Sequence, residues 1–295
     1  MQKNLKRLLL SMVMAAAVAF SASAQAWQMP AVPDTLLTPQ ERADFLAENY
    51  WTTLDTAVPG FDPASPEIEQ AFVDFLSIFP VASEQSRNRA VDNLLAVAQA
   101  DPAFFSAVRG MAEKYLFEPE SPLFCEEFFI PFLENFVKSP LLTEGEKTRA
   151  QAQLDMAMKN RPGTRLPDFG LTLRDGTETS LHAIPTADEA LLIFYNPGCE
   201  NCEELIGDLQ RNPSIQSRLS EGSMTILAVY SGDDRKLWDA TAASLPEAWI
   251  VGYEPDTLET EDLFDFRAFP TIYVIDKDKT VKIKDLSPAA FAPGF

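Results

Sequence analysis

Residues 190–202 read ALLIFYNPGCENC, and this stretch decides the fold of the second half of the chain. Its first six residues, 190–195, form a continuous apolar run, which is typical of a β-strand buried on both faces. The turn residues NPG at 196–198 follow, and apolar residues then recur at helical spacing beyond Cys202. We therefore expect a buried strand, a tight turn and a helix that begins at Cys199.

Cys199 and Cys202 have the spacing of a reactive dithiol. Unpaired backbone amides and the helix dipole stabilise an anion at a helix N-terminus, and the thiolate is the form of cysteine that attacks a disulfide. Cys202 falls one turn further along the same helix face, so it can attack a mixed disulfide that Cys199 has formed. We expect Cys199 to be the nucleophile and Cys202 the resolving cysteine.

Other interpretations of the Cys-x-x-Cys spacing remain open. A structural zinc site would need two more ligands, and the remaining candidates are Cys125 and His182, the only histidine in the chain. A purely structural disulfide would close a loop too small to stabilise the fold much through chain entropy. Both interpretations are weaker than the dithiol, so we expect no bound metal and no cofactor.

The sequence after residue 160 alternates between strand and helix patterns. A turn at Asp175-Gly176 predicts a β-hairpin over 170–180. Further strands are predicted at 190–195, 224–230, 249–253, 271–275 and 280–283. Helical segments are predicted at 205–219, 235–243 and 260–266. This alternation predicts an α/β domain over residues 161–295, with a central mixed sheet flanked by helices and an antiparallel hairpin at its edge.

The preceding residues, from about 38 to 160, have the pattern of a run of helices. Capping residues, often followed by proline, mark six predicted starts: Thr38-Pro39, Ser65-Pro66, Ser83-Glu84, Asp101-Pro102, Ser121-Pro122 and Thr143-Glu144. Apolar residues recur between them at helical spacing, as in the stripe formed by Cys125, Phe128, Phe129, Phe132 and Phe136. We expect an all-α domain over residues 27–160, with a buried, inert thiol at Cys125 and a linker at 161–164.

The first 26 residues have the pattern of a secretory signal peptide. Lys3, Lys6 and Arg7 precede an apolar run over 8–20, and small residues lead to Ala26. The run is shorter than the ~20 residues that cross a bilayer, so we expect cleavage after Ala26 rather than a membrane anchor. The mature chain is therefore predicted to be exported without membrane insertion.

The chain of 295 residues has a formal net charge of −20. Such an acidic surface repels the phosphates of nucleic acids and the head groups of anionic lipids. Nucleic acids and membrane surfaces are therefore poor candidate partners.

The C-terminal pattern resembles the thioredoxin fold. The resemblance is carried by the strand before the dithiol, the CENC motif at 199–202, the FPT sequence at 269–271 and the final hairpin. The LPDF sequence at 166–169 and the hairpin after it resemble the exported thiol-disulfide reductase branch, which includes cytochrome c maturation proteins. The helical half is similar to an uncharacterised domain that precedes such modules in secreted bacterial proteins.

The resemblance also implies a substrate-binding site. In the family, the proline at the position of Pro270 is cis and packs against the dithiol, and the backbone beside it pairs with an extended substrate segment. Phe269 would then be an apolar wall for a peptide substrate, or a residue that only fills the core. Together with Pro197 and Gly198, these two residues make up the expected substrate-binding site.

The chain departs from the patterns of related families around the dithiol. Ile193 stands where many thioredoxins carry a buried carboxylate, so the usual general base is missing. Asn196 stands where peroxiredoxins need a threonine, which disfavours peroxidase chemistry. Glu200, Glu203 and Glu204 oppose a stabilised thiolate and predict a reducing or intermediate potential, unless they form a solvated helix face with little effect.

The chain also ends soon after its last predicted strand. Residues 285–295 leave room for barely one helical turn, whereas the resemblance implies a longer closing helix. We expect part of the helical domain to pack in its place.

Together these features predict a periplasmic thiol-disulfide oxidoreductase that reduces or exchanges disulfides of exported proteins. Its expected partners are protein or peptide disulfide substrates and a membrane or periplasmic electron donor. A different hypothesis is a non-catalytic binding protein, whose helical domain recognises a partner and whose dithiol is structural. Reduction of insulin, and a mixed disulfide trapped by Cys202→Ser, would distinguish the two hypotheses.

Overall fold

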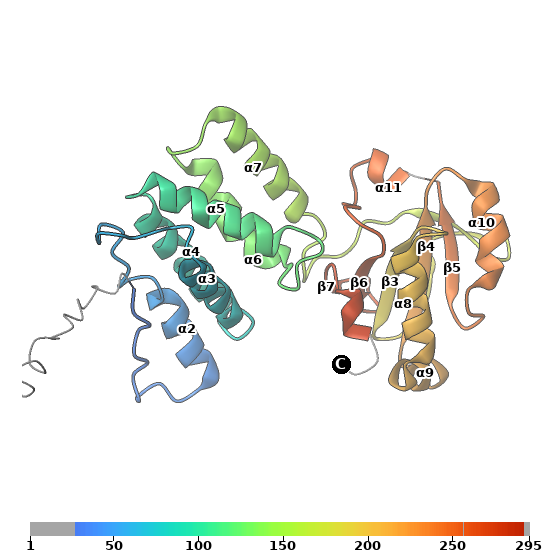
Figure 1. The fold of residues 1–295 in the computed structure, drawn as a ribbon. Helices are drawn as coiled ribbons and strands as arrows, with labels where there is room; N and C mark the ends of the chain where they lie inside the picture. Colours follow the sequence, from blue (N-terminus) through green and yellow to red (C-terminus); the bar gives the residue numbers. More distant parts are fainter. Residues whose placement is uncertain (1–26, 256, 292–295) are drawn as a thin grey trace, which may run out of the picture. The chain divides into compact units, whose positions relative to one another are not determined.

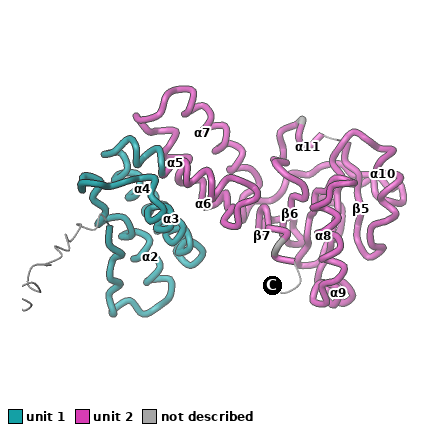
Figure 2. Tube along the Cα trace, in the orientation of Figure 1, with its two compact units in different colours: residues 1–107 teal, residues 108–295 magenta. Residues whose placement is uncertain are grey.

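The computed structural model describes residues 27–255 and 257–291, so the predicted signal peptide lies outside the described residues. The chain forms two compact units that divide between Ala107 and Val108 (Figure 2). The helices that precede the sheet are therefore shared between the two units. No helix in the described ranges is long and apolar enough to cross a membrane.

The helical half follows the capping pattern of the sequence. Its helices are α2 (Pro39–Asn49), α3 (Pro66–Ile78), α4 (Glu84–Ala98), α5 (Pro102–Leu116), α6 (Glu126–Lys138) and α7 (Glu144–Ala157) (Figure 1). The side chains of Thr38, Ser65, Ser83 and Thr143 each accept a hydrogen bond from a backbone amide of the first turn. Asp101 does the same for α5. Five of the six predicted helix starts are thus confirmed.

The predicted start at Ser121-Pro122 is wrong, because Ser121 closes a turn instead. The Ser121 hydroxyl accepts a hydrogen bond from the Leu123 amide, and its carbonyl accepts one from the Phe124 amide. Helix α6 begins only at Glu126, which leaves Cys125 as an extended N-cap residue of intermediate exposure. The expectation of a buried thiol at Cys125 is therefore not met, because the residue is the N-cap of α6 and has intermediate exposure.

The first compact unit has an aromatic core. Helix α2 packs on α3 and α4. The fully buried side chains between them include Tyr50, Trp51, Phe72, Phe75, Phe79 and Phe104. The ring centroids of Phe75 and Phe79 lie 4.9 Å apart in an edge-on arrangement. The helical spacing of aromatic residues is thus explained by core packing in this unit.

The second compact unit contains a seven-stranded mixed sheet with strand order β2-β1-β5-β4-β3-β6-β7. Its strands are β1 (Gly170–Leu173), β2 (Glu178–Ser180), β3 (Ala190–Tyr195), β4 (Thr225–Ser231), β5 (Ile250–Glu254), β6 (Thr271–Ile275) and β7 (Val281–Ile283). Strands β3, β4 and β5 are parallel, whereas β1 and β6 pair antiparallel to them. The predicted mixed sheet and its edge hairpin are therefore confirmed.

Strand β3 lies inside the sheet, between β4 and β6, and is buried along its whole length. One face of the sheet packs under helices α8 (Glu200–Arg211), α9 (Pro213–Ser220) and α10 (Arg235–Thr241), as Figure 1 shows for α8. The other face is covered by the side chains of residues 166–184 and 258–266. A strand that is buried on both faces needs no polar alternation, which explains its uniformly apolar sequence.

The predicted helix at 260–266 is wrong in its position. The structure has a single helical turn, α11 (Thr257–Thr260), and the chain then leaves helical geometry. Asp262 has a φ of 59°, in the left-handed region where a helix ends. The amide of Leu263 donates to the carbonyl of Leu258 and closes this end.

The predicted linker lies along an edge of the sheet. The backbones of Gly163 and Thr164 exchange hydrogen bonds of 2.8 Å with Val281 of β7. Helices α6 and α7 belong to the same compact unit as the sheet. Between β7 and residue 291, the last residue that the structure describes, the chain forms the short 3₁₀ helix η3 (Pro288–Phe291), which packs on α8.

Candidate functional site

The nucleophile predicted from the sequence lies where the helix dipole can act on it. Cys199 is the N-cap residue of α8, and its amide donates to the carbonyl of Asn196 across the turn that follows β3. Gly198 has a φ of 80°, a conformation that a residue with a Cβ adopts only under strain. The side chain of Cys199 is half-buried, so its sulfur can meet a partner from solution.

Cys202 differs sharply from Cys199 in its surroundings. Its side chain is 1% exposed and packs in the core beneath α8. Burial raises the pKa of the Cys202 thiol to about 12, and the neighbouring Cys199 thiol adds to this effect. At neutral pH, Cys202 is therefore a neutral thiol, buried beside the more accessible sulfur of Cys199.

The loop before β6 contacts the dithiol directly. The Phe269–Pro270 peptide bond is cis, as the resemblance implies. The Cys199 thiol donates to the carbonyl of Phe269, with a distance of 3.6 Å between sulfur and oxygen. The Phe269 ring stacks on Phe266 at a centroid distance of 5.6 Å and remains half-buried. Phe269 is thus both a packing residue and part of the surface beside the dithiol.

The surroundings of the motif are acidic at the surface and apolar beneath. Glu200, Glu203 and Glu204 are all exposed on the first turns of α8. Ile193 is 1% exposed and faces the same core as Cys202. An apolar side chain therefore occupies the position at which many thioredoxins carry a buried carboxylate. The geometry therefore offers no buried carboxylate from β3 to take the proton of Cys202.

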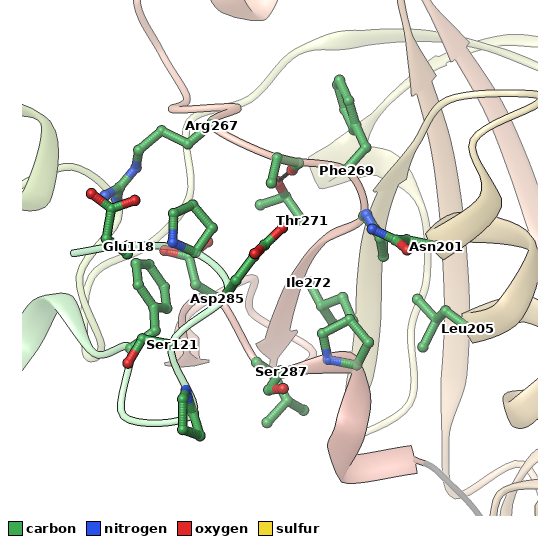
Figure 3. A pocket seen from close by; sticks show the side chains of 18 of the residues that line it. Glu118, Ser121, Asn201, Leu205, Arg267, Phe269, Thr271, Ile272, Asp285 and Ser287 are labelled. Atoms are coloured by element: carbon green, nitrogen blue, oxygen red, sulfur yellow. Dashed lines mark hydrogen bonds between the residues drawn. The ribbon is translucent and has the colours of Figure 1, made fainter. Parts of the chain in front are cut away.

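A cavity of about 1110 Å³ opens beside the dithiol (Figure 3). Its lining comes from the connection between α5 and α6, from one face of α8, from the loop before β6 and from the residues after β7. Asn201, inside the dithiol motif, and Phe269, which accepts the hydrogen bond from Cys199, both line it. The cavity therefore reaches immediate neighbours of Cys199, although neither Cys199 nor Cys202 is part of its lining.

A buried ionic cluster, two of whose members line this cavity, could not be predicted from the sequence. Glu126 at the start of α6 forms ion pairs with Arg267 and with Lys284. Arg267 also pairs with Asp265 at 2.7 Å, and Lys284 donates to the carbonyl of Lys159 at 2.8 Å. Burial lowers the pKa of Lys284 to about 8. The cluster joins the helical segment to the loop that carries Phe269.

The remaining cysteine and the histidine do not join the dithiol in a metal site. His182 accepts or donates a hydrogen bond at 2.9 Å with the carbonyl of Leu166 and lies 3.9 Å from Asp168. No cluster of three or more potential metal ligands is found among the residues that the structure describes. The three cysteines are free thiols.

Residues 10–160 match a family model described as a domain of unknown function (DUF5106). The chain is also similar to a thioredoxin-like protein from Bacteroides caccae, with a TM-score of 0.80 and 35% identity over 90% of this chain and 96% of that chain. None of the curated proteins matches the chain.

Two further solved structures resemble only part of the chain. The C-terminal domain of an uncharacterized protein from Bacteroides fragilis is 33% identical over 43% of this chain and 91% of that chain, with a TM-score of 0.42. The thioredoxin domain of a thiol-disulfide oxidoreductase from Bacteroides vulgatus is 18% identical over 43% of this chain and 89% of that chain, with a TM-score of 0.37.

The family model spans half of the chain, and the Bacteroides caccae protein shares the fold along nearly its whole length. The mixed sheet, the cysteine at the start of α8 and the cis-proline before β6 agree with that likeness. The chain therefore belongs to the DUF5106 family, and its C-terminal part has the thioredoxin-like fold.

Proposed function

We propose that this protein is a periplasmic thiol-disulfide oxidoreductase that reduces or exchanges disulfides of exported proteins. The observation that carries the proposal is the unequal pair at α8. Cys199 is accessible at the helix N-terminus, and the thiol of Cys202 is buried behind it with a pKa raised by burial. A structural disulfide would not need one accessible sulfur beside an open cavity.

The reaction begins at the accessible sulfur. The Cys199 thiolate attacks one sulfur of the substrate disulfide, a mixed disulfide forms, and the other substrate sulfur leaves and takes up a proton. Cys202 then loses its proton and attacks the sulfur of Cys199. The substrate leaves as a second thiol and the motif becomes a disulfide, so two electrons pass to the substrate. A thiol donor of the membrane or periplasm would return the dithiol to its reduced form.

Pro197, Gly198, Phe269 and Pro270 would bound the substrate groove in this scheme. The carbonyl of Phe269 supports this role, because it faces the sulfur that would join the substrate. An extended peptide could pair with the backbone here, next to the mixed disulfide.

Trapping of mixed disulfides tests the proposal. Reduced Cys202→Ser should accumulate a covalent adduct with insulin or with scrambled, disulfide-bonded substrate proteins, and Cys199→Ser/Cys202→Ser should not. Cys125→Ser is the matched control, because this third cysteine lies outside the motif and its loss should leave insulin reduction intact. Absence of both turnover and adduct would favour the binding-protein hypothesis.

Two measurements test the finer parts of the proposal. The acidic first turns of α8 support a reduction potential below about −180 mV, and a value near the −120 mV of a strong periplasmic oxidant would contradict this. Export predicts that the mature protein begins at Trp27, which N-terminal sequencing of the protein from the periplasmic fraction would check.

A further inference from the structure

The cavity beside the dithiol has the size and position of a substrate subsite. Its volume of about 1110 Å³ exceeds the ~300–1000 Å³ that holds a drug-sized ligand, so several side chains of a polypeptide can enter. Apolar surface is available from Phe124, Leu205 and Phe269. Since Phe269, which accepts the hydrogen bond from Cys199, is part of the lining, a polypeptide bound in the cavity can extend from there to the reacting cysteine.

Carboxylates dominate the charge of this lining. It contains six acidic residues and two cations. One of the two cations, Arg267, is already neutralised by Asp265 and by Glu126. By contrast, Glu118, Glu120 and Glu204 are exposed and form no ion pair with any other described residue. The open part of the cavity therefore carries unbalanced negative charge.

A further carboxyl group lies deeper in the same cavity. Figure 3 shows Asp285 in the middle of the lining, between the segment that carries Glu118 and the helix that carries Asn201. Burial raises the pKa of Asp285, and the positive charges of Lys284 and Arg267 oppose this shift. Asp285 therefore belongs both to the lining of the cavity and to the surroundings of the ionic cluster.

We propose that the cavity receives the polypeptide segment flanking the reacting cysteine of the substrate, and that its carboxylates select segments rich in lysine or arginine. This inference rests on the proposed function and names its substrate class. Glu118 and Glu120 belong to the connection between α5 and α6, so the helical part of the chain supplies part of the selectivity. Opposite charge raises the rate of encounter, and like charge lowers it.

Three symmetric peptide disulfides test the substrate class. Each is a dimer of a short peptide with one cysteine, flanked by lysine, by glutamine or by glutamate at the same positions. The reduced full-length protein transfers two electrons to each dimer and releases two peptide thiols, which chromatography can quantify. At low ionic strength we expect the lysine dimer to react about tenfold faster than the glutamate dimer, with a smaller ratio in high salt.

Two double variants separate the cavity from the overall charge of the protein. Glu118→Gln/Glu120→Gln should reduce the lysine-to-glutamate rate ratio by about threefold, because the rim loses two carboxylates without a change at α8. Glu247→Gln/Glu259→Gln removes the same charge from exposed positions that do not line the cavity, and should keep the wild-type ratio. Asp285→Asn tests the inner carboxyl group, since asparagine also tolerates the left-handed φ of 52° at this position.

The outcomes distinguish this inference from the function on which it rests. If no dimer is reduced, including the neutral glutamine dimer, the proposed oxidoreductase function fails and the inference fails with it. If all three dimers are reduced at equal rates, the oxidoreductase function stands and only the inference is overturned. The same holds if both double variants lower the rate ratio equally, because overall charge would then explain the preference.

Discussion

Replacement of Glu126 by glutamine should destabilise the second compact unit strongly. The side chain of Glu126 is 5% exposed and that of Lys284 is 4% exposed, so this ion pair is buried. Loss of one member of a buried pair costs about 3–5 kcal/mol, because the other charge remains without its partner. Here Arg267 keeps Asp265 and Lys284 keeps the Lys159 carbonyl, which reduces the expected loss to about 2–3 kcal/mol.

The neighbouring residue provides a matched control. Glu127 also lies in the first turn of α6, and both of its carboxylate oxygens accept hydrogen bonds from Arg161, at 2.9 and 2.7 Å. The side chains of this pair are 26% and 27% exposed, so water screens them. Glu127→Gln removes the same charge from the same helix terminus and should cost about 1 kcal/mol.

Urea unfolding of the full-length protein can compare the two substitutions. Far-UV circular dichroism and tryptophan fluorescence both follow the unfolding of the two compact units, since Trp51 lies in the first unit and Trp238 and Trp249 lie in the second. We expect a larger loss of unfolding free energy for Glu126→Gln than for Glu127→Gln. If Glu126→Gln costs no more than its neighbour, the buried cluster does not hold the helical segment to the sheet.

Three further predictions concern the dithiol, the backbone and acid stability. Because burial raises the pKa of Cys202 to about 12, release of a peptide from its mixed disulfide should accelerate about tenfold per pH unit between about pH 7 and 9, and a rate independent of pH would contradict this. Gly198→Ala should destabilise the protein by about 1 kcal/mol in urea unfolding, because its φ is 80°, whereas Gly110→Ala inside α5 should stabilise it by up to about 1 kcal/mol. A hydrogen bond from the backbone of the capping threonine lowers the pKa of Glu146 to about 2 from 4.5. This contribution to stability is therefore present above about pH 4.5 and is lost as the pH falls towards 2, and Glu146→Gln should flatten the dependence of the melting temperature on pH in that range.

Much of the sheet and of the dithiol could be predicted because their signals are local. Strand β3 is buried on both faces, so its burial can be predicted from its own six apolar residues. The position of Cys199 at the start of α8 follows from the turn residues just before it. Even the missing base at Ile193 needed only the identity of one residue in a predicted strand. In each case, neighbours in sequence supply the physical cause.

Other features depend on choices that local sequence leaves open. Ser121-Pro122 has the residues of a helix N-cap, but a serine hydroxyl can equally accept a hydrogen bond within a turn, as it does here. The four-residue helix α11 ends at Thr260 and is followed by Asp262 in a left-handed conformation, which the spacing of apolar residues does not predict. The ionic cluster joins residues more than a hundred positions apart, so their burial arises only when the sheet and α6 come together. The one sign of this burial in the sequence is that Glu126 falls at helical spacing from the apolar residues Phe129 and Ile130, on the same face of α6.

The environment of Phe269 depends on both local sequence and long-range contacts. From the sequence, Phe269 is either an apolar wall for the substrate or a residue that fills the core. In the structure, its ring stacks on Phe266 and its carbonyl accepts a hydrogen bond from Cys199. Arg267, two residues earlier, is paired with Glu126 of α6. The same short loop is therefore fixed at one end by the helical segment and placed at the other against the reactive sulfur. A change in the helical segment can thus reach the dithiol through three residues of backbone, which gives the helical part a physical means to influence thiol chemistry as well as substrate choice.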